Sequence, residues 1–172
     1  MDLKRYSAME YLRDGRMVKI RALLPADREA LVAAVHRMSD ESMYRRFFSA
    51  KKQFSEREVE FFTNVDFVDH VALVAVVEED TCPLIVGGAR YVIDAPGSAE
   101  VAFAVDDAHQ GLGIGGLLMK HLVAIARNAG LQRLNAEVLS DNAAMLKVFE
   151  KSGLPLRCER DRDTRHVALA LS

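Results

Sequence analysis

The sequence predicts a mixed α/β fold in which a central, mixed but mostly antiparallel sheet carries helices on both faces. Three strand-like runs between residues 71 and 105 are joined by short turns, which indicates an antiparallel meander. The last of these strands is followed by a helical pattern and then by another strand, and such a crossover makes the two strands that it connects parallel. We therefore expect both strand orientations in one sheet.

The bulk composition indicates one globular domain of ordinary size. Half of the 172 residues are hydrophobic and the net charge is −2, so there is no overall electrostatic case for binding nucleic acid or an anionic membrane. No apolar run approaches the roughly 20 residues that span a bilayer, and the N-terminus lacks the apolar core of a signal peptide. We expect a cytoplasmic protein with an N-terminal arm over residues 1–14 and a single domain over residues 15–172.

The first third of the chain predicts a strand and three helices. Residues 17–23 alternate apolar and basic side chains, which is the period of a half-buried strand. Residues 25–37 follow as a helix that begins at a proline. Ser39 and Ser55 are candidate N-caps of two further helices, and Glu58 completes a capping box with Ser55.

The rest of the chain alternates strands and helices, beginning with a continuous apolar run over residues 71–77 that predicts a strand buried on both faces. The later elements are strands over 84–93 and 100–105, a helix over 116–128 closed by Gly130, a strand over 131–139, a helix capped by residues 140–142 that ends at Gly153, and a last strand over 167–171 with which residues 154–159 pair.

A glycine-dense turn lies between the third strand of the meander and the long helix, and it reads Gln110-Gly111-Leu112-Gly113-Ile114-Gly115-Gly116. Glycine lets the main chain approach a ligand closely and adopt positive φ angles. The helix that follows directs unpaired N–H groups and the positive end of its dipole toward the turn. The sequence therefore predicts an anion-binding site at the head of this helix.

One interpretation of the turn is a dinucleotide site. Gly111, Gly113 and Gly116 have the spacing of the dinucleotide-binding fingerprint, and Glu137 lies about 20 residues further on, where an acid that binds ribose is expected. However, residues 106–110 separate these glycines from their strand, and a meander is not the parallel opening of a Rossmann half. This interpretation is the weaker one.

The other interpretation is a family resemblance. The pattern Gln-x-x-Gly-x-Gly at 110–115 resembles the coenzyme A pyrophosphate loop of the GNAT superfamily of N-acetyltransferases, and residues 142–154 resemble the second motif of that family. Residues 39–49 and 99–103 are similar to the acetyltransferase domain of bacterial Pat-type protein lysine acetyltransferases. Some of those proteins carry an additional nucleotide-binding or nucleotide-forming domain, for which this chain has no room. The resemblance covers most of the chain and implies the GNAT fold and acetyl-CoA as cofactor.

The resemblance also implies a function, an acetyl-CoA-dependent transfer of acetyl to the lysine side chains of a protein, with Glu100 as general base and direct attack in a ternary complex. It assigns the cofactor to the backbone of Phe103, Ala104 and Val105, to Gln110 and the turn Gly111, Leu112, Gly113, Ile114, Gly115 and Gly116, and to Asn142 and Phe149. Many relatives have a tyrosine at the position of Phe149, where it protonates the leaving thiolate. Phe149 has no hydroxyl that could supply this proton. The coenzyme A thiol, with a pKa of about 8.5 by analogy with cysteine, can leave as the thiolate without it.

Several alternatives stay open at this point. Glu137 is a second candidate base, and Asp106, Asp107 and His109 are interpreted as solvated loop residues. A small-molecule amine acetyltransferase, or a non-catalytic acyl-CoA-binding regulatory module, would use the same cofactor site.

Two smaller groups of residues carry less weight. Cys82 and Cys158 lie beside no His–acid pair in the sequence, have no metal-ligand spacing, and do not favour a covalent route or a metal site. The basic residues Arg45, Arg46, Lys51 and Lys52 are interpreted as a solvated helix face.

Overall fold

The structure is a computed structural model that describes residues 2–48 and 54–171. Within them, one sheet has the order β1-β2-β3-β4-β5-β6-β8-β7. The strands are β1 (Ser7–Tyr11), β2 (Met17–Ala22), β3 (His70–Glu79), β4 (Cys82–Ala95), β5 (Ser98–Val105), β6 (Arg133–Leu139), β7 (Leu156–Asp161) and β8 (Thr164–Ala170). The helices are α1 (Arg28–His36), α2 (Asp40–Phe47), α3 (Glu56–Thr63), α4 (Ile114–Asn128) and α5 (Ala143–Glu150).

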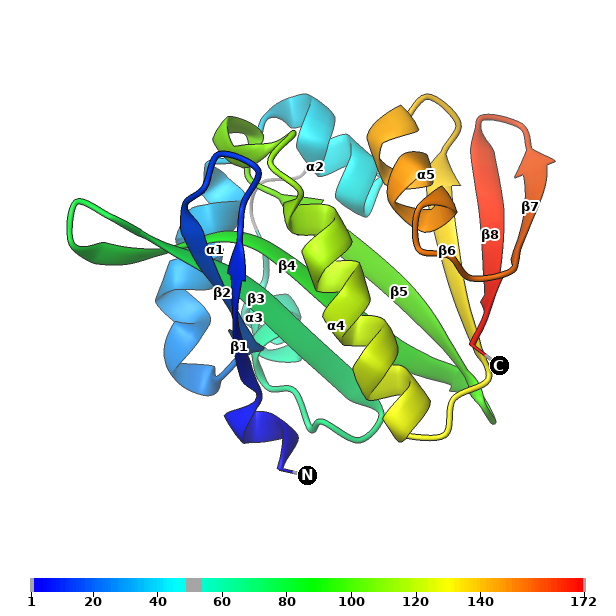
Figure 1. Cartoon of the computed structure of the whole chain (residues 1–172), viewed down its shortest axis with the longest axis horizontal. Coiled ribbons are helices and arrows are strands. Elements are labelled where there is room, and N and C mark those ends of the chain that lie inside the picture. The colour runs from blue at the N-terminus through cyan, green and yellow to red at the C-terminus, as the bar shows by residue number, and fades with distance from the viewer. Residues whose placement is uncertain (1, 49–53, 172) are drawn as a thin grey trace.

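The layers follow the predicted fold. Helices α4 and α5 lie on one face of the sheet, whereas α1 and α3 lie on the other, with α2 at one end of the central strands (Figure 1). Strands β3, β4 and β5 form the expected antiparallel meander, and β5 and β6, joined through α4, are parallel. No helix in the described ranges is long and apolar enough to cross a bilayer.

The prediction of a loose N-terminal arm is wrong. Residues 7–11 form the edge strand β1, which pairs with β2 from Ser7–Arg21 to Tyr11–Met17. The side chains of Tyr6 and Glu10 contact His121 and Lys120 of α4, which fixes the strand against the helix. An edge strand with one solvated face buries few of its own side chains, so its sequence lacks a strong apolar period.

The core is divided by the sheet into two clusters. The larger one lies under α4 and includes Tyr91, Leu118 and Phe149, all nearly inaccessible to solvent. A smaller one, including Leu23 and Val74, lies under α1. Strand β3 supplies side chains to both clusters, which confirms the prediction that it is buried on both faces.

Strands β5 and β6 pair over only a short distance. Their register runs from Ser98–Arg133 to Glu100–Asn135. Beyond these pairs β5 continues to Val105 and β6 to Leu139, but the two strands are no longer partners. The sheet therefore opens at Glu100, and this opening positions the candidate site.

Candidate active site

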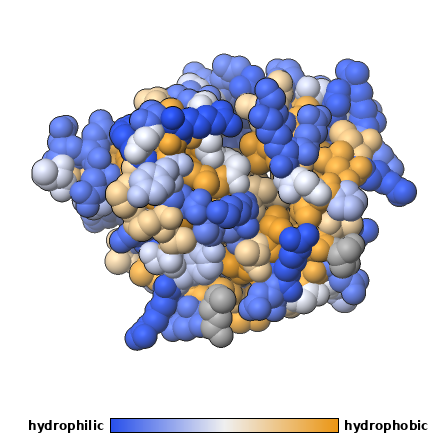
Figure 2. Space-filling view, in the orientation of Figure 1, coloured by the Kyte–Doolittle hydropathy of each residue, from blue (hydrophilic) through white to orange (hydrophobic). Residues whose placement is uncertain are grey.

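A cleft of about 690 Å³ occupies the opening between β5 and β6. Its walls are the glycine turn, the end of β5, and the start of α5, and it has the size of a small-molecule site. Figure 2 shows hydrophobic residues exposed between hydrophilic ones on the face on which α4 and α5 lie. The lining of the cleft combines apolar side chains, such as Phe103 and Ile114, with the polar groups of the turn.

The glycine turn has the geometry that the sequence predicts. Gly111 and Gly113 adopt φ angles of +82° and +92°, which are accessible to glycine at little cost. Gly113 is the N-cap of α4, so the helix begins at Ile114, two residues earlier than the predicted start at Gly116. The N–H groups of the first helical turn have no intrahelical acceptor and remain available to an anion.

The turn is also open on its outer side. A Cβ atom at Gly111 or Gly116 would meet no described heavy atom within 4 Å, whereas one at Gly115 would lie 3.2 Å from Val148 Cγ2. Gly115 therefore permits the close approach of α4 and α5, and the other two leave space for a ligand. The residues present fit a cofactor that carries a pyrophosphate.

Arg13 supports the turn from the β1–β2 hairpin and was not predicted. Its backbone N–H donates to the Leu112 carbonyl at 3.0 Å, and its Nη1 donates to the Gly111 carbonyl at 3.3 Å. The guanidinium thus lies beside the anion-binding turn. No local pattern could have identified it, because the contact joins residues about 100 positions apart in the chain.

The interpretation as solvated residues is wrong for Asp106 and His109, whereas Asp107 is exposed as expected. His109 is only 5% exposed and its Nδ1 lies 2.8 Å from Asp106 Oδ2. Asp107 accepts hydrogen bonds from the backbone N–H of Ser39 and the hydroxyl of Ser42, which attach the connector to α2. The connector is therefore a fixed support for the glycine turn.

Backbone groups of β5 line the cleft between the glycine turn and Glu100. Phe103, Ala104 and Val105 pair with β4 on one side, and alternate N–H and C=O groups point to the other side, where β6 has diverged. The Val105 carbonyl accepts a hydrogen bond from Gln110 Nε2 at 3.3 Å. Gln110 therefore links the strand to the turn.

The second motif forms the opposite wall. The Asn142 side chain accepts a hydrogen bond from the backbone N–H of Met145 and so caps α5, while it also lines the cleft. Phe149 is 1% exposed and packs edge-on against Phe103 with their ring centroids 5.9 Å apart. Phe149 is thus a packing residue at the floor of the cleft.

Glu100 lies at the point where β5 and β6 separate. It lines both the cleft and a second, polar groove of about 390 Å³ that runs over β6, β7 and β8. Its carboxylate accepts no hydrogen bond from a side chain of the described residues. The Glu137 carboxylate, in contrast, lies 2.6 Å from His166 Nδ1. Of the two candidate bases, Glu100 is the one that no side-chain hydrogen bond restrains.

The two cysteines do not line the cleft. Both are exposed and unpaired. Cys82 begins β4 and Cys158 lies on β7, and neither contributes to the described lining of the cleft.

A glycine turn at a helix head, beside two parallel strands that diverge, forms an open cleft whose backbone N–H groups can bind an anionic cofactor. The comparison with known proteins gives the family. Residues 35–154 match the family model "Acetyltransferase (GNAT) family", and the chain belongs to that family. Acetyl-CoA is the cofactor of the family, so the dinucleotide interpretation of the turn is wrong.

Individual relatives agree with this assignment. The chain is 38% identical over 144 residues to Acetyltransferase Pat of Mycolicibacterium smegmatis, an alignment that covers 83% of this chain and 42% of Pat, so the chain spans less than half of that relative. It matches the GNAT domain of S. lividans PAT with a TM-score of 0.86 and 36% identity, over 95% of this chain and 96% of that one.

A more distant structure, YncA of Salmonella typhimurium with its cofactor acetyl-CoA, shares the fold. Its TM-score is 0.71 at 20% identity, over 90% of this chain and 94% of that one.

Proposed function

We propose that this protein is an acetyl-CoA-dependent N-acetyltransferase whose acceptor is a lysine side chain of another protein. The observation that carries the proposal is the position of Glu100, where the cofactor cleft and the polar groove meet. An acceptor in the groove would present its amine to Glu100 from the side opposite the glycine turn. The likeness to Pat supports lysine as the acceptor.

The polar groove suits a cationic acceptor. Four carboxylates line it, against two guanidinium groups: Asp94, Glu100, Glu137 and Glu159 against Arg133 and Arg157. A cleft with an excess of one charge concentrates ligands of the opposite charge. A lysine ammonium is therefore attracted toward the residue that would remove its proton.

Glu100 is assigned the role of general base. The pKa of a lysine amine is about 10.4, so deprotonating it at pH 7 costs about 4–5 kcal/mol. A carboxylate placed at the amine accepts that proton as the new bond forms, which contributes about 10²–10⁴-fold to the rate.

Backbone groups complete the assignment. Acetyl-CoA, when bound, supplies an acetyl thioester. The amides of 111–116 would hold its pyrophosphate, and Asn142 would hydrogen-bond its pantetheine arm. Free N–H groups of β5 between Phe103 and Val105 would donate to the carbonyl oxygen as negative charge develops there. With both cysteines outside the cleft lining, direct attack by the amine is favoured over a covalent enzyme intermediate.

The test is an acetyl-CoA turnover screen in which release of the free thiol is followed with proteins, lysine peptides, polyamines, aminoglycosides and amino acids as acceptors. Turnover with lysine-containing proteins and not with small amines supports the proposal. Turnover only with small amines would favour a small-molecule acetyltransferase. Binding of acetyl-CoA without turnover of any acceptor would favour a regulatory module.

The base is tested by a matched pair of variants. Glu100→Gln should lower turnover at least about 100-fold and leave the affinity for acetyl-CoA within about twofold. Glu137→Gln removes the same charge from the neighbouring strand and should lower turnover only slightly. Unchanged turnover in Glu100→Gln would refute the assignment, and a large loss confined to Glu137→Gln would transfer the role to Glu137.

A further inference from the structure

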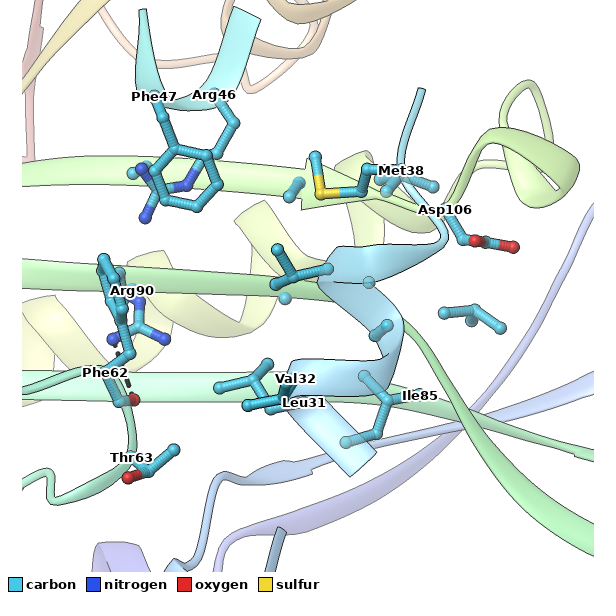
Figure 3. A pocket seen from close by; sticks show the side chains of 18 of the residues that line it. Leu31, Val32, Met38, Arg46, Phe47, Phe62, Thr63, Ile85, Arg90 and Asp106 are labelled. Atoms are coloured by element: carbon cyan, nitrogen blue, oxygen red, sulfur yellow. Dashed lines mark hydrogen bonds between the residues drawn. The ribbon is translucent and has the colours of Figure 1, made fainter. Parts of the chain in front are cut away.

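A second pocket of about 90 Å³ lies beside the catalytic cleft, between α1, α2, α3 and the strands β4 and β5 (Figure 3). Its walls are mostly aliphatic and aromatic, with Leu31, Val32 and Ile85 on one side and Phe47 and Phe62 on the other. The pocket and the cleft share several lining residues, among them Met38, Arg46 and Ala102. The two spaces are therefore adjacent, and the pocket lies on the face of β5 that carries Ala102 and Glu100.

Two arginines, Arg46 of α2 and Arg90 of β4, point into this apolar pocket (Figure 3). The sequence-based interpretation of Arg46 as part of a solvated helix face is therefore wrong, and Lys51 and Lys52 lie outside the described residues. Both guanidinium groups are enclosed by protein but keep some access to the pocket. Their arrangement is unusual, because a mostly apolar wall rarely contains two like charges. The Asp106 carboxylate on the same wall pairs with Arg37.

Arg90 is held with part of its donor set unused. Its Nη1 donates to the Phe62 carbonyl at 3.1 Å and lies 3.0 Å from His70 Nε2. Burial lowers the pKa of His70 to about 4, so the ring is neutral at pH 7 and accepts this hydrogen bond. Arginine has five N–H donors. The donors on Nε and Nη2 have no acceptor among the described residues.

Arg46 and Arg90 also lack a carboxylate partner, unlike the arginines around them. Arg37 pairs with Asp106 and Arg45 with Glu41. No described carboxylate lies within 4 Å of Arg46 or Arg90, and Arg46 instead stacks over the Phe47 ring, with Cζ 4.5 Å from the ring centroid.

Both groups keep their charge at neutral pH. Burial lowers the pKa of Arg46 to about 10, an effect that the Glu100 carboxylate opposes. Burial and then repulsion by Arg46 lower the pKa of Arg90 to about 9. The Arg46 charge therefore disfavours the charge on Arg90, and an anion bound beside Arg90 would offset this repulsion.

Arg46 and Arg90 lie close to the place where the acceptor amine would meet Glu100. Arg90 lies directly opposite Ala102 on β5, and Ala102 is two residues from Glu100 on the same face of the strand. Two residues along a strand span about 7 Å. An anionic group held by the arginines is thus within the length of a short side chain of an amine at Glu100.

We propose that Arg46 and Arg90 form an acceptor subsite that binds a carboxylate carried close to the reactive amine. The fork of a guanidinium matches a carboxylate, which accepts two parallel hydrogen bonds. Two sources share this chemistry: an acidic side chain next to the target lysine in a protein, or the carboxylate of a free amino acid. This inference rests on the proposed acetyltransferase function and adds a specificity element to it.

The experiment compares matched acceptors at saturating acetyl-CoA. One pair is a peptide with Lys-Asp against the same peptide with Lys-Asn, and the other is lysine against lysine amide. We expect kcat/KM to favour the carboxylate member of at least one pair by about 10- to 100-fold, since the lost contacts are charge-assisted hydrogen bonds. The pair that shows the preference identifies the source.

Substitutions then test whether the preference for carboxylate-bearing acceptors depends on Arg46. Arg46→Met should abolish it by raising KM for the carboxylate acceptor about 10- to 100-fold, and Arg46→Lys should reduce it partly, because lysine keeps the charge but loses the fork. Arg57→Met removes an exposed charge from α3 and should keep the preference. No preference in the wild type, or a preference that persists in Arg46→Met, overturns the inference.

A binding measurement separates this inference from the proposed function. Glutarate should raise the melting temperature of the CoA-saturated wild type more than glutaramide does, and this difference should vanish in Arg46→Met. If no amine is acetylated but glutarate still binds through Arg46, the function is wrong and the anion subsite stands. If lysine-containing proteins are acetylated but glutarate and glutaramide behave alike, the subsite is wrong and the proposed function stands.

Discussion

The substitution Gly113→Ala tests whether the glycine turn binds the cofactor through its backbone. Gly113 has φ +92° and ψ 6° at the N-cap of α4. A Cβ there would lie 3.5 Å from Arg13 Nε, which is ordinary contact, so the change adds no clash. A left-handed conformation costs an L-residue about 1–2 kcal/mol, and the stiffer unfolded chain offsets about 0.4–1 kcal/mol of that. We expect a net loss of about 1 kcal/mol.

Gly130→Ala is the matched control at the other end of the same helix. Gly130 has φ +83°, and its Cβ would meet no described heavy atom within 4 Å. Both variants should therefore lose about 1 kcal/mol, or about 2–4 °C in melting temperature for a chain of this size. Only Gly113→Ala should also misalign the N–H groups at the head of α4, and the loss of one charge-assisted hydrogen bond lowers affinity about 10- to 100-fold.

The assay is calorimetric titration of acetyl-CoA together with thermal unfolding of the unliganded proteins. Equal stability losses with an affinity loss in Gly113→Ala alone would support the reasoning. If Gly113→Ala binds acetyl-CoA within twofold of the wild type, or if Gly130→Ala weakens binding equally, the backbone of the turn does not hold the cofactor.

Three further changes probe the fold around the site. Because burial lowers the pKa of His70 to about 4, the unfolded chain takes up the proton first, and stability should fall as the pH drops from about 6.5 to about 4, by roughly 1–2 kcal/mol after solvent screening. In urea titrations at several pH values, His70→Gln should reduce the dependence of the free energy of unfolding on pH. An unchanged pH dependence in this variant would contradict the assignment to His70. Phe149→Ala should destabilise the protein by about 3–5 kcal/mol, since it leaves a cavity against Phe103; a loss below about 1 kcal/mol in chemical unfolding would contradict the packing role. Asp107→Ala removes the acceptor for Ser42 and should cost about 0.5–2 kcal/mol, whereas unaltered unfolding would show that the connector is held elsewhere.

Local signals in the sequence predicted most of the fold. The capping box of Ser55 and Glu58 is present, with both reciprocal hydrogen bonds. Ser39 caps α2 by accepting from the Ser42 N–H. Such signals are reliable because the groups that satisfy each other are three residues apart and meet as soon as the helix forms.

The features that the sequence did not reveal depend on contacts between distant segments. β1 has a weak apolar period and is recognisable only by its pairing with β2. His109 has a polar neighbourhood in the sequence but is buried in the structure. Arg46 lies in the last turn of a short amphipathic helix, beside Phe47, and nothing local shows which way its guanidinium points.

The sequence by itself determined the glycine turn, the strand that leads to it and the order of the elements from β2 onward, because each depends on residues close together in the chain. The tertiary structure decided what surrounds the turn. It brought Arg13 to the carbonyls of Gly111 and Leu112, opened β5 from β6 at Glu100, and placed Arg46 and Arg90 in one mostly apolar pocket. These outcomes follow from packing and strand register, which are set by the whole fold, and no short segment of the sequence contains them.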